Sequence, residues 1–443
     1  MPNLDEKFAR IKPSFTPNEA VIEASRCLFC HDAPCIKACP TSIDIPMFIR
    51  QIMTKNTKGA AKTIFTQNIL GKSCAQVCPT KVLCEGACVY LDLNEKPIDI
   101  GRLQGFASDF AINNKVYFFE KGKPTGKKIA IIGGGPAGLS CAHELTILGH
   151  EAVVFEANKK AGGLNSYGVA PYKFTNTDAQ EEIEYIKNIG FEIKTGFIVS
   201  NKSGKDMISI SELEKEYSAI FISTGLGKSK KTKIKGENLI GVIGATEFIY
   251  ELREKEQNIK VGKKVIIIGA GNTAIDAAVE SSKLGAEVII IYRRTENEQK
   301  AYSFEIEYAK KNNVKLIYLT SPIEIIGNKT VEGLKCIKNE LLKTNNSSKP
   351  EIRQIENSEF IIPCDMVITA IGQESKTELF SLIPNLELKN GIISVNKDFQ
   401  TTNPQYFAGG DCINGGKEVV NAVQHGRDAA RGIDRYLMKM KGE

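Results

Sequence analysis

The strongest constraint on the fold is an internal repeat of two glycine-rich segments. KKIAIIGGGPAGLSCAHELTILGHEAVVFE begins at Lys127, and KKVIIIGAGNTAIDAAVESSKLGAEVIIIYRR begins at Lys263. Each pattern predicts a buried strand, a glycine turn, an amphipathic helix and a second buried strand. Such βαβ units place their strands side by side in a parallel sheet, so the repeat predicts an α/β fold.

The first copy is typical of a dinucleotide site. Its glycines follow the strand and open the helix, where missing side chains let a pyrophosphate approach the backbone amides. The second strand ends in a glutamate, whose carboxylate could accept hydrogen bonds from both ribose hydroxyls, and this ending favours FAD. Glycines needed only for helix–sheet packing are the alternative interpretation. The candidate FAD-binding residues here are Gly133, Gly135, Pro136, Ala137, Gly138 and Glu156.

The second copy differs where the first copy has its glutamate. Tyr292 takes that position, and Arg293 and Arg294 follow it. Guanidinium groups can bind a ribose 2′-phosphate in a bidentate manner, which favours NADPH, although a solvated basic turn and NADH remain alternatives. We therefore expect NAD(P)H to bind at Gly269, Gly271, Asn272, Thr273, Ala274, Arg293, Arg294 and Lys300.

Two further motifs extend the flavin site. Ser223-Thr224-Gly225 lies between the copies, and FAGGD near the C-terminus is expected to bring the chain back to the flavin, with a helix starting near Glu418. This order is similar to that of two-dinucleotide-binding (Rossmann-like) flavoprotein reductases, in which the NAD(P) domain is inserted into the FAD domain. The additional candidate FAD residues are Gly163, Leu164, Thr224, Gly225, Gly410 and Asp411.

A Lys, Gly and Pro cluster at residues 121–128 marks a domain boundary. We expect an α-helical iron–sulfur domain at 1–122, an FAD-binding domain at 123–228 and 371–443, and an NAD(P)-binding domain at 229–370. The polar segment from Lys343 to Glu359 is expected to be an exposed loop.

Eight of the twelve cysteines lie between Cys27 and Cys88, in the patterns C-x2-C-x4-C-x3-C-P and C-x3-C-P-x5-C-x3-C. Zinc sites usually show paired C-x2-C knuckles, whereas C-P endings resemble ferredoxin runs, so two 4Fe-4S clusters are expected. Counting alone assigns all eight thiolates to the clusters. The other four are expected to be core residues, Cys141, Cys336, Cys364 and Cys412. Because the cofactors supply the hydride chemistry, no catalytic side chain is expected.

Composition excludes several classes of protein. The net charge of +6 is small for 443 residues and the basic residues are interspersed, which argues against a nucleic-acid partner. No signal peptide or membrane-spanning apolar run is visible in the sequence. A soluble protein of the reducing cytoplasm is therefore expected.

Specific motifs cover nearly the whole chain: SRCLFCHDAPCIKACP, CAQVCPTKVLCEGACVY, IGRLQGFASD, YGVAPYKF and FAGGDCINGGKEVVNAVQHG. With the glycine motifs, they resemble the NAD(P)H-oxidising module of bacterial dihydropyrimidine dehydrogenase and the glutamate synthase small subunit. The resemblance implies cluster ligands Cys27, Cys30, Cys35 and Cys88 for one cluster and Cys39, Cys78, Cys84 and Gln104 for the other. Cys74 would then be an unligated buried thiol, against the simple count.

The resemblance implies an electron-input subunit. It would take a hydride from NAD(P)H onto FAD and pass single electrons through the clusters to a separate subunit with an FMN and iron–sulfur barrel, which reduces uracil or thymine. The printed chain ends at Glu443 without such a barrel, so a hetero-oligomer is expected. The alternatives are a glutamate synthase small subunit, a reductase of free ferredoxin with or without electron bifurcation, and a non-enzymatic redox sensor.

Overall fold

The protein folds into two compact units, which are described separately. The computed structural model describes residues 10–254, 259–342 and 350–439. The larger unit contains residues 10–166, 171–226 and the described residues from Ser375 onward, and the smaller unit contains residues 167–170 and 227–374. The segment expected to bind NAD(P)H, 229–370, lies within the smaller unit. None of the helices in the described ranges is long and apolar enough to cross a membrane.

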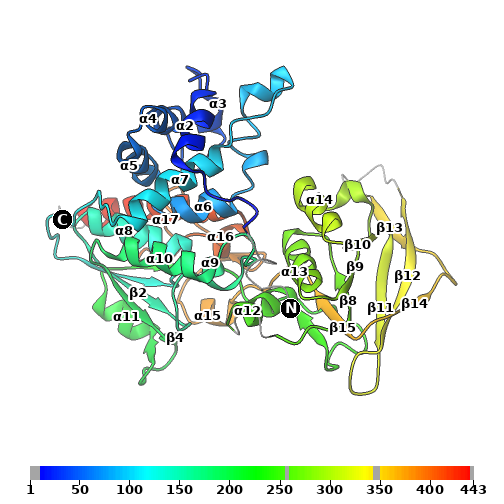
Figure 1. Cartoon of the computed structure of the whole chain (residues 1–443). Helices are drawn as coiled ribbons and strands as arrows, with labels where there is room; N and C mark the ends of the chain where they lie inside the picture. Colours follow the sequence, from blue (N-terminus) through cyan, green and yellow to red (C-terminus); the bar gives the residue numbers. More distant parts are fainter. Residues whose placement is uncertain (1–9, 255–258, 343–349, 440–443) are drawn as a thin grey trace. The chain divides into compact units, whose positions relative to one another are not determined.

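The N-terminal part of the larger unit is helical, which confirms the expected helical domain (Figure 1, blue to cyan). Thr16 and Glu19 form a capping box at the first described helix, and Asp44 and Asn56 accept backbone hydrogen bonds at the starts of two others. The apolar faces meet in a core that includes the fully buried Phe48. The elements are α2 (Pro17–Ser25), α3 (Pro34–Lys37), α4 (Ile45–Met53), α5 (Thr57–Gln67), α6 (Gly71–Val77), η1 (Thr80–Val82), η2 (Val89–Leu93) and α7 (Ile100–Asn113).

The first glycine-rich copy forms the centre of a parallel five-stranded sheet in the larger unit, with the order β18-β6-β1-β2-β3. The predicted βαβ unit is confirmed as β1 (Lys128–Ile132), α8 (Pro136–Ile147) and β2 (Glu151–Glu156). Strand β18 (Tyr406–Ala408) pairs with β6 (Ala219–Ile222), so the chain returns to this sheet near its C-terminus. The other elements are α9 (Leu164–Tyr167), α10 (Asn176–Lys187), β3 (Glu192–Thr195), β4 (Ile198–Ser200), β5 (Met207–Ser209), α11 (Ile210–Glu216), α15 (Thr377–Phe380), β16 (Leu388–Lys389), β17 (Ile392–Ile393), α16 (Asp411–Asn414) and α17 (Val419–Lys439).

The second copy forms the centre of the corresponding sheet in the smaller unit, with the parallel order β10-β9-β8-β15-β7. An antiparallel sheet of β11, β12, β13 and β14 accompanies it. The elements are β7 (Val242–Gly244), α12 (Ala245–Glu254), β8 (Lys264–Ile268), α13 (Asn272–Lys283), β9 (Glu287–Ile291), η3 (Glu296–Glu298), α14 (Ser303–Lys311), β10 (Lys315–Ile317), β11 (Thr320–Ile326), β12 (Gly333–Leu342), β13 (Glu351–Gln354), β14 (Phe360–Pro363) and β15 (Met366–Thr369).

Strand β13 corrects the expectation of a loop from Lys343 to Glu359. Glu351–Gln354 pairs with β12 although this strand is mostly polar, because an edge strand exposed on both faces needs backbone hydrogen bonds and no apolar pattern. Residues 343–349 of that segment lie outside the described residues.

The four cysteines outside the N-terminal cluster are core residues, as predicted. Cys141, Cys336, Cys364 and Cys412 are all buried. Burial raises the pKa of Cys336, Cys364 and Cys412 to about 12, so these thiols stay protonated and packed as small apolar side chains.

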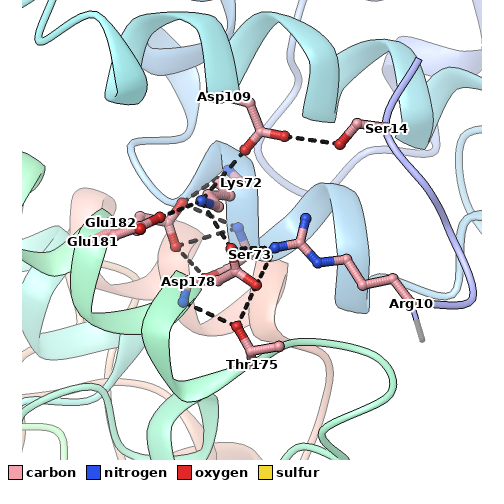
Figure 2. A network of polar contacts seen from close by, with 9 residues as sticks. All are labelled: Arg10, Ser14, Lys72, Ser73, Asp109, Thr175, Asp178, Glu181 and Glu182. Atoms are coloured by element: carbon pink, nitrogen blue, oxygen red, sulfur yellow. Dashed lines mark hydrogen bonds and ion pairs between the residues drawn. The ribbon is translucent and has the colours of Figure 1, made fainter. Parts of the chain in front are cut away.

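A buried ion-pair network joins the helical part to the flavin-side helix α10 within the larger unit (Figure 2). The ammonium group of Lys72, in α6, lies 3.4 Å from Asp109 of α7, 3.0 Å from Asp178 and 2.9 Å from Glu181 of α10. Arg10 forms a further ion pair with Asp178. Although burial lowers it, the hydrogen bond to Glu181 and the charges of Asp109 and Asp178 raise the pKa of Lys72 overall. Lys72 and its three carboxylate partners therefore hold the helices α6, α7 and α10 together.

Glu182 lies beside this network and caps the first turn of α6 from another helix. Its carboxylate accepts hydrogen bonds from the backbone amides of Lys72 at 2.8 Å and Ser73 at 3.1 Å, and from the Ser73 hydroxyl. Asn165 donates to the same hydroxyl at 2.8 Å. Burial raises the pKa of Glu182 to about 7 despite these hydrogen bonds.

The raised pKa of Glu182 predicts that the free energy of unfolding depends on pH, and that this pH dependence is smaller in Glu182→Gln. Because the folded-state pKa of about 7 lies above the ordinary value of 4.5, the folded protein holds the proton more tightly than the unfolded chain. The contribution is fully present below pH 4.5 and is lost as the pH rises through 7. We expect the change in unfolding free energy over this window to shrink by roughly 1–3 kcal/mol in Glu182→Gln, measured by denaturant titration. Glu184→Gln, at an exposed position of the same helix, should leave the pH profile unchanged, and an equal loss in both variants would contradict this prediction.

Candidate functional site

The expected flavin residues converge because they follow neighbouring parallel strands. Gly133 follows β1, Glu156 ends β2, Thr224 comes shortly after β6, and Gly410 comes shortly after β18. All four strands belong to one parallel sheet, so their carboxyl ends lie at the same edge. Gly163 joins them there, since a Cβ added to it would lie 2.9 Å from the Cα of Gly135. The structure therefore brings the predicted residues of distant segments to one edge of the sheet.

The glycines of the first turn have different structural roles. A Cβ on Gly133, whose φ is +106°, would lie 2.6 Å from the carbonyl oxygen of Ser223, and one on Gly138 would lie 2.0 Å from the carbonyl oxygen of Gly133. A Cβ on Gly135 would meet only the Cα of Gly163, at 3.8 Å. Gly133 and Gly138 are thus required by packing, whereas Gly135 leaves open space above the start of α8, where a pyrophosphate can approach.

Glu156 and Thr224 provide polar groups at this edge. The Glu156 carboxylate is buried and accepts hydrogen bonds from the amides of Gly134 and Asn158, both at 2.8 Å. Oε1 also accepts from the side-chain amide of Asn158 at 2.8 Å, so the carboxylate is held in place and Oε2 keeps a further lone pair for a ribose hydroxyl. The Thr224 hydroxyl is buried and has no hydrogen-bond partner within the described part of the chain, so a bound polar ligand would satisfy it. The residues present fit a dinucleotide.

The C-terminal motif lies at the same edge of the sheet, where a Cβ on Gly410 would be 3.2 Å from the Cβ of Ala137. Gly410 has a φ of +80°, and its amide donates to Nδ1 of His425 at 3.2 Å. Asp411 begins α16 and accepts from the amide of Lys417 at 3.1 Å, and burial raises its pKa. The predicted final helix begins at Val419, one residue after the expected Glu418. Pro136 and Ala137 open α8, Leu164 opens α9, and Gly225, with a φ of +62°, follows Thr224.

The smaller unit has a cavity at the carboxyl ends of β7, β8, β9 and β15. Its lining includes six of the eight residues expected to bind NAD(P)H: Gly269, Gly271, Thr273, Arg293, Arg294 and Lys300. Asn272 instead accepts a hydrogen bond from the amide of Tyr302 at 3.1 Å, and Ala274 is buried in α13, so these two residues shape the turn.

The cavity suits an anionic nucleotide. A Cβ on Gly271 would meet no atom within 4 Å, which leaves the start of α13 accessible to phosphate. The Nε atom of Arg294 is buried without a hydrogen-bond partner among the residues that the structure describes. Lys300 is placed beside the glycine turn by a backbone hydrogen bond to Ala270 at 3.1 Å. Basic groups from two segments thus face the same cavity.

A first cysteine cavity lies among the N-terminal helices of the larger unit. Cys27, Cys30, Cys35 and Cys88 line it together, although Cys88 lies far from the others in the sequence. Apolar side chains, including Ile45, form the rest of its wall. These are the four cysteines that the family resemblance groups together.

A second cavity contains the other ligand set. Cys39, Cys78, Cys84 and Gln104 line it, and so does Cys74. Nε2 of Gln104 donates to the Gly71 carbonyl at 2.8 Å, so the amide oxygen points away from that carbonyl. The amide nitrogen of Asn68, which also lines this cavity, is buried without a hydrogen-bond partner in the described ranges. A donor of this kind suits a cluster, whose sulfur atoms accept hydrogen bonds.

Each cavity contains thiols whose pKa is raised. Burial raises the pKa of Cys35 to about 12, and burial followed by the charge of Glu85 raises that of Cys84. A hydrogen bond with Cys74, followed by burial, raises the pKa of Cys78. No three thiol, imidazole or carboxylate groups in the described residues are close enough to hold a single metal ion, but a four-iron cluster spaces its ligands more widely. The sites therefore fit clusters whose binding displaces the thiol protons.

Sequence reasoning missed several residues that build these sites. Gly162 has a φ of +118° and donates to the Gly134 carbonyl at 2.7 Å, and the Gly162-Gly163 dipeptide was a signal for it. His425 stands in a motif that carried the resemblance but had no assigned role. Val420 of α17 lines the second cysteine cavity, and no local sequence pattern predicts this contact.

The open space at Gly135 predicts a selective loss of flavin. We expect Gly135→Val to fold but to retain FAD at least about tenfold more weakly, because the added side chain occupies the pyrophosphate path. Flavin absorbance per protein after gel filtration measures this. Gly271→Val, at the matching position of the second copy, should keep the flavin and raise KM for NAD(P)H. Equal flavin content in wild type and Gly135→Val would contradict the assignment.

Comparison with known proteins agrees with this architecture. The family model described as pyridine nucleotide-disulphide oxidoreductase matches residues 127–426, and the model described as dihydropyrimidine dehydrogenase domain II, 4Fe-4S cluster, matches residues 4–116. Among solved structures, Mycobacterium tuberculosis FprA in complex with NADPH matches with a TM-score of 0.60 at 19% identity, covering 72% of this chain and 86% of that chain. Thioredoxin reductase of T. acidophilum matches with a TM-score of 0.54 at 22% identity, covering 71% and 99%. At these identities the likeness shows the fold.

Curated relatives match over nearly the full chain. NAD-dependent dihydropyrimidine dehydrogenase subunit PreT of Escherichia coli O157:H7 is 34% identical, covering 96% of each chain. The glutamate synthase (NADPH) small chain of Escherichia coli K12 is 32% identical, covering 97% of this chain and 94% of that one. The NADP(+)-dependent formate dehydrogenase subunit beta of Moorella thermoacetica is 33% identical over 91% of this chain and 60% of its own length. The chain therefore belongs to the pyridine nucleotide-disulphide oxidoreductase family, in the group that contains the PreT subunits and the glutamate synthase small chains, and is an oxidoreductase that uses FAD, NAD(P)H and 4Fe-4S chemistry.

Proposed function

We propose that the protein is the electron-input subunit of a dihydropyrimidine dehydrogenase. It takes a hydride from NAD(P)H onto FAD and delivers single electrons, through two 4Fe-4S clusters, to a separate FMN-containing subunit that reduces uracil or thymine. The observation that carries this proposal is the division of the N-terminal cysteines between two cavities, each with the ligand set of the dihydropyrimidine dehydrogenase pattern. The similarity to PreT subunits over 96% of the chain supports the final substrate.

The position of the second cavity supports an order of electron transfer. Val420 lines this cavity and belongs to α17, the helix that follows the flavin-side Gly410 turn. The second cavity therefore borders the flavin-binding part of the larger unit. The ligand cysteines of the first cavity are all partly exposed, whereas Cys78 in the second is buried. We infer that electrons enter at the second cluster and leave from the first, toward the partner.

The structure also supports particular roles for the binding residues. Glu156 and Thr224 would bind the FAD, with Gly135 and Gly410 allowing close approach of the backbone. Arg293, with Arg294 and Lys300, would bind the phosphates or the 2′-phosphate of NAD(P)H. The relatives include both NAD-dependent and NADPH-dependent enzymes, so we propose both NADH and NADPH as substrates of this protein. The other FAD and NAD(P)H residues named from the sequence motifs keep their proposed binding roles, whereas Asn272 and Ala274 would shape the glycine turn.

We propose the domain limits and the compartment on similar grounds. The iron–sulfur domain would span 1–122, the FAD domain 123–228 and 371–443, and the NAD(P) domain 229–370. All twelve cysteines are free thiols in the structure, which suits a reducing cytoplasm. The protein would act in a hetero-oligomer with its barrel subunit.

The decisive test is the activity of the native complex. We expect anaerobic affinity purification from the native host to recover a partner with an FMN barrel, and the complex to oxidise NAD(P)H in a uracil-dependent manner. NAD(P)H should also bleach the flavin of this chain alone. A large amidotransferase partner, with turnover of glutamine and 2-oxoglutarate, would replace the proposal by glutamate synthase. A flavin that NAD(P)H does not bleach would reject every electron-input function.

Gln104 and Cys74 can be distinguished by paired substitutions. We expect Gln104→Ala to leave flavin bleaching by NAD(P)H intact and to slow electron delivery to the partner at least about tenfold, because the second cluster loses its oxygen ligand. Cys74→Ser should keep both the iron content and the rate. Stopped-flow absorbance and iron analysis measure these effects. Loss of iron in Cys74→Ser, with normal transfer in Gln104→Ala, would reverse the assignment.

A further inference from the structure

A short segment before the first helix is fastened on both sides of Lys12. On one side, the amide of Ile11 donates to the carbonyl of Tyr172 at 3.1 Å. On the other, Nε of Arg102 donates to the carbonyl of Pro13 at 2.9 Å. Together with the ion pair of Arg10 and Asp178, these contacts fix the backbone that carries Lys12. The lysine is therefore held in a defined place, unlike a side chain on a loose terminal segment.

This segment places the Lys12 ammonium at the C-terminal end of α6. Its Nζ atom donates to the carbonyl of Ala75 at 3.2 Å and to the carbonyl of Cys78 at 3.1 Å. The last carbonyls of a helix lack intrahelical partners and carry partial negative charge, so a cation is stabilised there. Because Cys78 also lines the second cavity, the ammonium group lies close to the proposed cluster.

Two of the groups that act on the Lys12 ammonium, Cys78 and Cys84, line the second cavity. Burial lowers the pKa of Lys12 overall; the charges of Glu85, Cys78 and Cys84 act in the opposite direction, and Lys173 lowers it further. Glu85 is held next to this cavity, since its carboxylate accepts hydrogen bonds from the Thr80 hydroxyl at 2.8 Å and from the Gly101 amide at 2.9 Å, and both of these residues line the cavity. Lys12 thus provides positive charge beside a site that has a carboxylate and that would have thiolates once a cluster is bound.

We propose that Lys12 is a positioning residue whose fixed positive charge raises the reduction potential of the cluster in the second cavity. The inference rests on the proposed function, because it requires a cluster at Cys39, Cys78, Cys84 and Gln104. When this cluster accepts one electron from the flavin, its net charge becomes more negative by one, and no proton or bond is exchanged. A nearby cation stabilises the reduced form more than the oxidised form. Lys12 therefore favours movement of electrons from the flavin into the second cluster.

Redox titration of the intact holoprotein, followed by EPR spectroscopy, tests this inference. In Lys12→Met we expect the ratio of reduced to oxidised second cluster at a fixed potential to fall about tenfold, which corresponds to about 59 mV for a one-electron couple. Because Gln104 is proposed to ligate only the second cluster, the EPR signal that changes in Gln104→Ala is the signal of that cluster. Lys62→Met, which removes an exposed lysine of α5 in the same helical part, should leave the ratio unchanged.

Two further variants separate charge from structure. Lys12→Gln keeps a hydrogen-bond donor but lacks the charge, and it should shift the potential as Lys12→Met does. Lys12→Arg keeps the charge and should restore most of the wild-type ratio. An unchanged potential in Lys12→Gln with full iron content would overturn the inference, and so would an Arg variant that behaves like the Gln variant. Wild-type protein without iron in the second cavity would overturn the proposed function instead, and iron analysis shows this before any titration.

Discussion

The buried charge of Lys72 is the constraint on which the arrangement of the larger unit depends. A buried ammonium group is stable only when it is paired, and its partners come from α7 and α10. The iron–sulfur helices and the flavin-side helix must therefore meet at this point (Figure 2). Helix α6, which carries Lys72, also carries Cys74 and leads directly to Cys78, so the same contact fixes one wall of the second cavity.

Parallel sheets provide the second level of organisation. Each sheet collects the ends of strands that are far apart in the sequence, so short motifs after β1, β6 and β18 become neighbours at one edge. The glycines there divide into those that packing requires, such as Gly138, and those that leave room for a ligand, such as Gly135. Both residues are glycines of the same motif, so only their surroundings in the folded protein give them different roles.

The electrostatic environment of the second cavity follows from the ion pairs of Lys72 and from the arrangement of the parallel sheets. Glu85 contributes negative charge, and the cysteines would add to it as thiolates once a cluster is bound. Lys12 is held at the end of α6 because hydrogen bonds fix the backbone on both sides of it. An oxygen ligand from Gln104 in place of a thiolate would reduce the negative charge further. Ligand choice and the placement of the lysine thus act in the same direction, toward a cluster that accepts electrons more readily.

The sequence by itself determined the two βαβ units, the helical N-terminal part and the core positions of the four outlying cysteines, because apolar periodicity and glycine turns are local signals. It also grouped the candidate ligands, through motifs that carry a family resemblance. Only the tertiary structure decided that β13 is a strand, that Val420 borders the second cavity and that Lys12 reaches the end of α6. These features depend on strand pairing and on contacts between residues that are distant in the chain. In the sequence alone, β13 looks like an exposed loop, Val420 like any residue of an apolar helix face, and Lys12 like an ordinary lysine near the N-terminus.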